Sequence, residues 1–139
     1  MKRELTIQSE PVDEARLVAG RQLAPSAGAV VSFLGVVRGL EEGAVIGGLE
    51  YEAFRAMAEH QFQLIFDEVE RRWPLHSVRL VHRTGPVRVG EASLWVEVVS
   101  GHRGEAFAAA QWIIDEMKRT VPIWKRPFGV AQDGGLDQQ

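Results

Sequence analysis

Four cations flank a short apolar segment in the stretch MKRTVPIWKR, residues 117–126. At about 100° per residue, a helix ending before Pro122 places Lys118 only about 20° outside an apolar stripe. Its amine can snorkel to water, or it can be partly desolvated, which would make it a nucleophile or a base. The negative end of the helix dipole acts the other way and stabilises the ammonium form. The stripe comprises Phe107, Ala110, Ile114, Met117 and Val121.

Lys125 is expected close to Lys118. The chain should be extended after Pro122, so that Ile123 and Lys125 share one face and Trp124 occupies the other. The two lysines can then meet around a helix-to-strand corner. A solvated basic patch explains the same cations equally well from composition alone.

Three further cations stand at the ends of predicted elements. The stretch SGHRGEAF, residues 100–107, ends a strand and opens a helix, which puts His102 and Arg103 beside the free N–H groups of the first turn. Such a helix start can seat a phosphate. An ordinary helix cap with incidental cations explains the pair as well. Arg38 ends a hydrophobic strand, where a strand commonly meets water.

Metal and cofactor chemistry has little support in the sequence. The remaining histidines, His60, His76 and His82, show no metal-ligand spacing, and the chain has no cysteine. Neither the phosphate-binding loop of nucleotide-binding proteins nor a GxGxxG pattern occurs. We therefore expect no metal and no cofactor, and the absence of cysteine also excludes a thiol nucleophile on this chain.

Charge and hydropathy bound the partners and the compartment. The net charge of −3 has the wrong sign for a protein that binds a nucleic-acid backbone. The longest apolar runs fall short of the ~20 residues that a membrane span requires. The N-terminal stretch MKRELTIQSE has no apolar signal core, so we expect a cytoplasmic protein that contacts neither membrane nor nucleic acid.

The elements that must position these residues follow from hydrophobic periodicity. The pattern predicts strands at residues 4–8, 29–38, 49–54, 76–85 and 91–101 and after Pro122, and helices at residues 11–23, 55–72 and 104–120. The 139 residues suit a single domain over 1–139. The order of the predicted strands and helices along the chain mixes hairpins with crossovers. This indicates an α+β fold with a mixed, largely antiparallel sheet and packed helices.

Three local expectations go with this pattern. The strand at 49–54 should pair with the one before residues 39–48, and residues 86–90 should form a hairpin turn between two strands. Residues 39–48 contain four glycines and few apolar anchors, so we expect a mobile lid. We also expect residues 127–139 to be a flexible tail.

Five segments occur in a characteristic order: GAVVSFLGVVRG, LEYEAFRAMAE, HRTGPVRVGE, SGHRGEAF and KRTVPIWKR. Together, over roughly residues 5–126, they resemble the large, catalytic subunit of molybdopterin synthase. The resemblance implies an α/β-hammerhead fold and a sulfurtransferase. In that family a small ubiquitin-like subunit inserts its C-terminal Gly-Gly thiocarboxylate into a pocket on each copy of a central dimer, forming a heterotetramer. The reaction adds two sulfurs to cyclic pyranopterin monophosphate and forms the dithiolene of molybdopterin.

The resemblance also assigns roles to the cations. It implies that Lys118 and Lys125 are catalytic and that the partner subunit delivers the sulfur, which agrees with the absence of cysteine. The substrate-binding positions that it implies are Val36, Val37, Arg38, His102, Arg103, Lys118, Lys125 and Arg126. Because Arg103 and Lys118 would lie roughly 22 Å apart on one helix, we expect each site to combine two copies of the chain.

The chain departs from this family after residue 126. The family commonly has an acidic residue there, followed by a tail with a tryptophan and basic residues, whereas this chain has Pro127 and the tail FGVAQDGGLDQQ. No substrate contact is therefore carried over from the tail. Two other readings stay open: a Schiff-base lysine enzyme that uses Lys118 on a small phosphorylated carbonyl compound, and a non-enzymatic ligand-binding α+β module.

Overall fold

The computed structural model of the chain describes residues 1–131 and has the expected α+β architecture. Its elements are β1 (Lys2–Gln8), α1 (Glu14–Ala19), β2 (Ala29–Val36), β3 (Leu40–Glu41), β4 (Ala44–Val45), β5 (Gly48–Ala53), α2 (Arg55–Arg72), β6 (Leu75–Arg83), β7 (Gly85–Arg88), β8 (Ala92–Ser100), α3 (Arg103–Thr120) and β9 (Ile123–Phe128). The strands form one four-stranded, one three-stranded and one two-stranded sheet within these residues.

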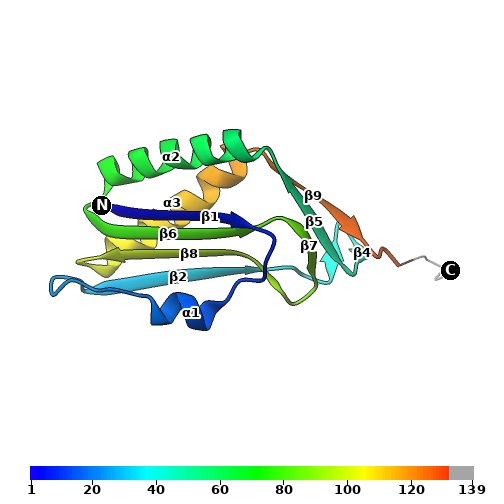
Figure 1. The fold of residues 1–139 in the computed structure, drawn as a ribbon, viewed down its shortest axis with the longest axis horizontal. Helices are drawn as coiled ribbons and strands as arrows, with labels where there is room; N and C mark the ends of the chain where they lie inside the picture. Colours follow the sequence, from blue (N-terminus) through cyan, green and yellow to red (C-terminus); the bar gives the residue numbers. More distant parts are fainter. Residues whose placement is uncertain (132–139) are drawn as a thin grey trace.

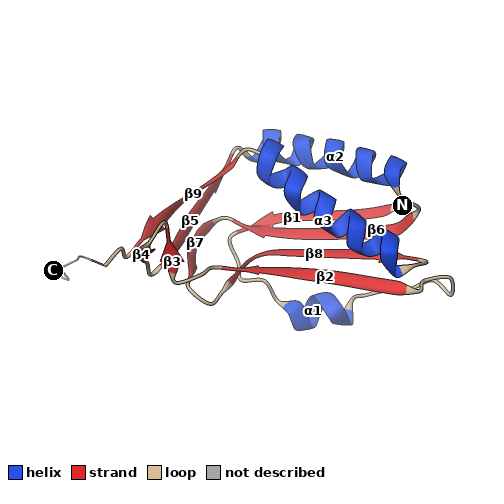
Figure 2. Cartoon of the chain, turned by 180° about the vertical axis from the view of Figure 1, so that it is seen from behind, coloured by secondary structure: helices blue, strands red, loops and turns tan. Residues whose placement is uncertain are grey.

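The four-stranded sheet has the order β1-β6-β8-β2. Only β1 and β6 are parallel, and the other two pairs are antiparallel. Helices α2 and α3 cover one face of this sheet, whereas the short α1 lies on the other face (Figures 1 and 2). Alternate residues of β6 and β8 point toward α2 and α3, which gives the core its period of two. Its central members are Phe62, Phe66, Val78, Leu80, Val96, Val98 and Ile113.

The two long helices meet the sequence prediction to different degrees. In α2 the expected positions Phe62, Ile65, Phe66 and Val69 are buried, and Met57 is exposed. In α3 the expected stripe is partly right, because Ala110 and Met117 are buried, but Phe107 is 60% exposed. The buried face consists of Ala106, Ala109, Ala110, Ile113 and Met117. Its alanines let the helix approach the sheet closely, and helical periodicity alone cannot choose between two overlapping stripes.

The three-stranded sheet, order β7-β5-β9, lies beyond one end of the four-stranded sheet (Figure 1). The expected pairing of residues 49–54 with residues 29–38 is wrong, because β5 pairs antiparallel with β7 and β9 instead. The expected hairpin is confirmed in one respect, because β6 and β8 do pair. Their connection contains β7, and Gly85, with φ 79°, allows the turn by which the chain passes into the second sheet.

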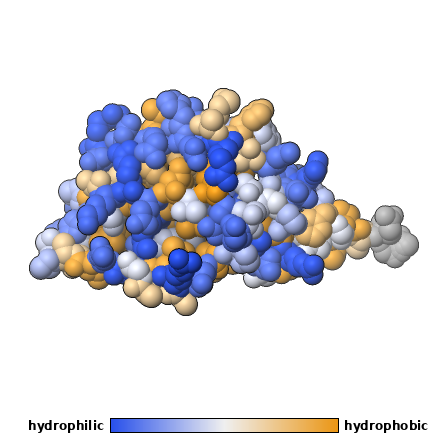
Figure 3. Space-filling model, in the orientation of Figure 1, coloured by the Kyte–Doolittle hydropathy of each residue, from blue (hydrophilic) through white to orange (hydrophobic). Residues whose placement is uncertain are grey.

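The segment expected to be a mobile lid is a small hairpin. Strands β3 and β4 pair across a turn in which Glu42 and Gly43 have φ values of 49° and 82°. Ile46 is only 5% exposed and packs with Val37, Leu49 and Val87, so the expected shortage of apolar anchors is wrong. Hydrophobic residues gather on the surface at this end of the molecule (Figure 3), where Leu40 and Val45 are exposed.

Strand structure continues past Arg126 into the segment expected to be a flexible tail. Pro127 and Phe128 are the last residues of β9. The N–H of Ala131 then donates a hydrogen bond to the carbonyl of Val45 at 2.9 Å. The rest of the expected tail, residues 132–139, lies outside the described residues.

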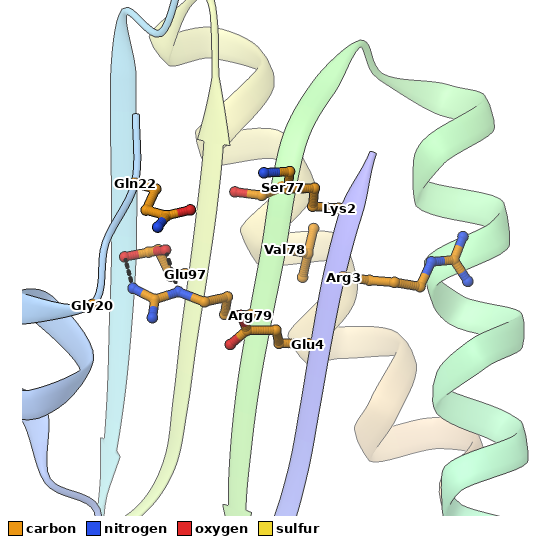
Figure 4. Close-up of a pocket in the computed structure, with 9 residues that line it drawn as sticks. All are labelled: Lys2, Arg3, Glu4, Gly20, Gln22, Ser77, Val78, Arg79 and Glu97. Atoms are coloured by element: carbon orange, nitrogen blue, oxygen red, sulfur yellow. Dashed lines mark hydrogen bonds and ion pairs between the residues drawn. The ribbon is translucent and has the colours of Figure 1, made fainter. Parts of the chain in front are cut away.

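A buried ion cluster lies on the sheet face that carries α1. The carboxylate of Glu97, 1% exposed, accepts hydrogen bonds from Arg79 at 2.8 and 3.0 Å and from Arg21 at 2.7 Å. Figure 4 shows the pairing with Arg79, while Arg3 points away toward α2. Arg79 also donates to the carbonyl of Leu17 in α1 at 2.8 Å. The cluster therefore ties α1 to the sheet.

Glu97→Gln is expected to destabilise the chain by about 3 kcal/mol or more, because it leaves two arginines without their buried counter-charge. Burial alone would raise the pKa of Glu97, but the hydrogen bonds from Arg79 and Arg21 outweigh it and hold that pKa below its ordinary 4.5. The carboxylate therefore stabilises the fold above pH 4.5, and this contribution is lost as the pH falls through the lowered pKa. Urea unfolding at pH 7 and at about pH 3 measures both effects.

The matched control is Glu116→Gln, which removes the exposed ion pair with Arg119 on α3. It should cost less than about 1 kcal/mol. An equal loss of stability in the two variants would contradict the larger contribution that we assign to the buried cluster. So would a stability of Glu97→Gln that depends on acid pH as strongly as that of the parent chain.

Candidate active site

A cavity of about 670 Å³ lies where the two larger sheets and the end of α3 meet. Its walls come from β2 and the residues that follow it, from β5, β6 and β8, from the last turn of α3 and from β9. This volume suits a small organic ligand. The cavity at Arg79 and Glu97 (Figure 4) has a volume of only about 60 Å³, and these two charged residues of its lining already pair with each other.

The structure brings five of the predicted site residues to the large cavity: Val36, Val37, Arg38, Lys118 and Lys125. The first three are supplied by the end of β2, where the pairing register with β8 shifts after Gly35. Lys118 comes from the last turn of α3. Because Pro122 cannot continue that helix, the chain turns there and β9 carries Lys125 back along the cavity. The corner expected from the sequence is therefore present.

Strand alternation in β9 also agrees with the sequence. Ile123 and Lys125 line the cavity, whereas Trp124 lies on the other face. There the Trp124 ring packs edge-on against Phe54, with a centroid distance of 5.2 Å. Arg126 is exposed and does not line the cavity, because it too falls on the face opposite Lys125.

His102 and Arg103 are not part of this cavity. His102 is the N-cap of α3, where its side chain makes no capping hydrogen bond, and Arg103 is the first residue of the helix. Both are exposed. An 18-residue helix is roughly 27 Å long, so the two ends of α3 cannot face one small ligand within one chain.

Lys118 is exposed in the single chain. The partly desolvated amine considered from the sequence is therefore not present, because the side chain extends beyond the buried face of α3 instead of lying over it. A Schiff-base mechanism needs a neutral amine, which desolvation normally favours, and the exposure of Lys118 gives that reading no support.

Glu41 is a site residue that the sequence analysis missed. Its carboxylate lies 3.6 Å from the amine of Lys125 and lines the same cavity. Glu41 belongs to β3, which is distant in sequence from β9 and Lys125. The contact depends on the β3–β4 hairpin. The one signal for it in the sequence was the pair of acidic residues in a glycine-rich loop.

Three more polar residues line the cavity and were not proposed for it: Tyr51, His82 and Ser93. The Tyr51 hydroxyl donates to the hydroxyl of Ser93 at 3.3 Å. The rings of Tyr51 and His82 meet edge-on, with centroids 5.3 Å apart. Burial lowers the pKa of His82 from its ordinary 6.5, and its hydrogen bond to the carbonyl of Arg83 opposes that effect. The alternating pattern of β6 is the signal that could have placed His82 on the inner face.

Cations, one carboxylate and a buried imidazole thus face a cavity with apolar walls. Arg38, Lys118 and Lys125 can bind an anionic ligand, and His82 can accept a proton. Within residues 1–131 no group of three His, Asp or Glu side chains is arranged to hold a metal ion. None of the helices in that range is long and apolar enough to cross a membrane.

Known proteins resemble this chain in sequence and in fold. The family model described as MoaE protein matches residues 7–120. The molybdopterin synthase catalytic subunit of Staphylococcus carnosus is 43% identical over 112 residues, which cover 81% of this chain and 73% of that protein. The crystal structure of molybdopterin synthase from Staphylococcus aureus superposes with a TM-score of 0.81 at 35% identity, covering 89% of this chain and 90% of that one.

A second solved structure concerns an assembly. It is a protein–protein complex of subunits 1 and 2 of the molybdopterin-converting factor from Helicobacter pylori. One chain of it matches with a TM-score of 0.75 at 25% identity, and the match covers 88% of this chain and 83% of that one.

Proposed function

Since the chain belongs to the MoaE protein family, we propose that it is the catalytic subunit of a molybdopterin synthase. It transfers sulfur from the thiocarboxylated C-terminus of a small ubiquitin-like subunit to cyclic pyranopterin monophosphate. Two such transfers form the dithiolene of molybdopterin. The chain is therefore a sulfurtransferase that receives its sulfur from a partner and holds none of its own, since it has no cysteine.

The observation that carries this proposal is the cavity shared by Arg38, Lys118 and Lys125. Both reactants are anions, because one carries a phosphate and the other a thiocarboxylate. A cavity in which three cations converge brings two anions together and offsets their mutual repulsion. An ammonium group can also protonate an oxygen that leaves as the carbon–sulfur bond forms. Lys118 and Lys125 take these catalytic roles, and Arg38, Val36 and Val37 hold the substrate.

The apolar walls of the cavity suit the partner's tail. An extended Gly-Gly segment has no side chains, so it needs a narrow channel with apolar walls and with backbone groups that can hydrogen-bond to it. Val121 and Ile123 line the cavity beside the two lysines. They offer such walls at the place where the thiocarboxylate has to arrive.

The chain works as a homodimer within a heterotetramer, and the free edge of β2 is the surface that we assign to the dimer. It is the last strand in the order β1-β6-β8-β2, and no strand within residues 1–131 pairs with its outer side. Phe33, Leu34 and Val36 are exposed along it. A long apolar edge without charged or proline residues invites another strand to pair with it.

A two-fold axis at the β2 edge also supports a shared site. An antiparallel β2–β2 pair would bring the start of one strand beside the end of the other. Gly28, just before the start of β2, donates its N–H to the carbonyl of Ser100, next to the turn that leads to His102. His102 and Arg103 of one copy would then approach the cavity that holds Lys118 of the other, and Arg126 would remain at its rim.

Reconstitution tests the function directly. The purified chain is mixed with a thiocarboxylated small subunit and cyclic pyranopterin monophosphate, and the dithiolene product is assayed. Product should form only when all three components are present, and an unmodified small subunit should yield none. Absence of dithiolene from a folded chain with a competent partner would overturn the proposal.

We further propose that the chain acts in the cytoplasm, which remains an expectation from its sequence. Fractionation of cells that express the full-length chain, followed by detection with an antibody, tests it. Recovery in an exported or membrane fraction would contradict it.

A further inference from the structure

His82 occupies a position where the fold would otherwise place an apolar side chain. It follows Val78 and Leu80 on the inner face of β6, and both are core residues. The His82 side chain is 5% exposed. Burying an imidazole removes it from water without the stabilisation that an apolar side chain would give. A chemical role would explain why His82 ends this row of inward-facing residues.

The hydrogen bonding of His82 defines its tautomer. Its Nδ1 lies 2.7 Å from the carbonyl oxygen of Arg83. A carbonyl can only accept, so Nδ1 carries the proton, and in the neutral ring Nε2 has a free lone pair. Burial lowers the pKa of His82, which favours this neutral form near pH 7. The edge-on contact with Tyr51 fixes the plane of the ring. His82 is therefore an oriented, neutral base on the wall of the cavity.

Two hydroxyl groups line the same cavity. Tyr51 from β5 and Ser93 from β8 are joined by a 3.3 Å hydrogen bond, and each hydroxyl keeps capacity for a further one. A water held by these groups and by His82 would have several polar partners, which is what an ordered water needs.

The proposed function requires such a water. The thiocarboxylate sulfur bonds to the substrate carbon as a carbon–oxygen bond there breaks, and the leaving oxygen takes a proton from a lysine ammonium group. The sulfur remains bonded to the carbonyl carbon of the partner's terminal glycine. The product of that step is a thioester that links the small subunit to the pterin. The sulfur stays on the pterin only if water breaks the bond between the sulfur and the glycine carbonyl.

We propose that His82 is the general base for this hydrolysis and that Tyr51 and Ser93 position the water. The inference rests on the proposed function. Nε2 of His82 removes a proton from the water, whose oxygen bonds to the glycine carbonyl carbon. The carbon–sulfur bond breaks, and the electron pair leaves with the sulfur as a pterin thiolate. The new carboxylic acid releases its remaining proton to solvent, and the small subunit departs with an ordinary carboxylate. Lys118 or Lys125 offers the positive charge that stabilises the thiolate.

Several titratable and charged groups face the same cavity as His82. Facing the cavity with His82 are Tyr51 of β5, Lys118 of α3, Lys125 of β9, and Arg38 and Glu41 from the segment after β2. Arg83 follows His82 on β6 and pairs with Glu91 at 3.2 Å. Glu41 and Glu91 offset part of the positive charge of these groups, and burial is the main cause that lowers the pKa of His82 and keeps it available as a base.

The test is a single turnover of the complex, followed by intact-mass measurement of the small subunit. In His82→Asn the amide nitrogen can replace Nδ1 as the donor to Arg83, but nothing replaces Nε2. The small subunit should then accumulate as a pterin adduct, with hydrolysis slowed about a hundredfold and adduct formation changed by no more than a few-fold. His60→Gln, an exposed substitution on α2, is the control and should behave like the parent chain.

A second readout separates a base from a structural residue. In the parent chain, hydrolysis should slow as the pH falls through the lowered pKa of His82, whereas the variant should lack this dependence. If His82→Asn does not fold, as judged by its melting curve, His82→Gln is measured in its place. Hydrolysis within a few-fold of the parent in a folded variant would overturn the role of His82 alone. A parent chain that yields neither adduct nor dithiolene would overturn the proposed function as well.

Discussion

Lys118→Ala is expected to fold like the parent chain and to lose sulfur transfer by about a hundredfold or more. The side chain is exposed at the end of α3, so its removal creates no cavity, and alanine is a good helix former. The variant loses the ammonium group, which lines the cavity together with Val121 and the residues after β2. Dithiolene formation by the reconstituted complex measures the effect, and thermal unfolding checks the fold.

Arg119→Ala is the matched control for this experiment. Arg119 follows Lys118 on α3, is exposed, and pairs with Glu116 outside the cavity. It should retain activity within a factor of a few, because it removes a neighbouring charge without touching the site. If Lys118→Ala were as active as Arg119→Ala, Lys118 would have no part in the reaction.

A mixture of Lys118→Ala and Arg103→Ala subunits is expected to recover activity that neither variant has alone. Arg103 begins α3 and Lys118 lies in its last turn, too far apart to serve one ligand in one chain. In a two-fold dimer that shares its sites, a mixed dimer contains one site with both residues intact and one with neither. After full exchange of equal amounts, about a quarter of all sites should be intact.

Exchange between subunits has to be verified independently, for example by native mass spectrometry of chains with different tags. With exchange established, activity near the sum of the two homodimers would mean that each site lies within one chain. The β2 edge can be tested in the same assay, since Leu34→Lys should weaken the dimer by placing a charge on an apolar edge. Dimers that persist unchanged in Leu34→Lys would move the interface elsewhere.

Local sequence determined most elements of this protein. The helix at residues 55–72 has the bounds expected from its periodicity, because Pro74 ends it and its apolar face repeats every third or fourth residue. The corner at Pro122 and the shared face of Ile123 and Lys125 also follow from the geometry of a few neighbouring residues. Through this corner, the position of both lysines beside one cavity was predictable.

The family resemblance supplied what periodicity did not. The nature of the ligand and the need for a partner were inferred from five segments in order, and the matches to the MoaE protein family confirm the family. The roles of the individual cations remain predictions. From their positions alone, His102 and Arg103 were indistinguishable from an ordinary helix start.

Tertiary structure alone decided which strands pair. The strand at residues 48–53 has an alternating pattern that suits several partners, and the fold pairs it with β7 and β9 instead of with β2. Among the described residues, that choice leaves one edge of β2 without a strand partner, and it creates the cavity between the two sheets. Strand pairing depends on contacts between residues far apart in the chain, so no local pattern reveals it.

The same reason explains the polar residues that the sequence analysis overlooked. Glu41, Tyr51, His82 and Ser93 come from four different strands and belong to no common motif. Each is unremarkable among its neighbours in sequence. They become a carboxylate beside Lys125 and an oriented base with two hydroxyls only because two sheets and the end of α3 converge on one cavity, where burial and hydrogen bonding determine what each group can do.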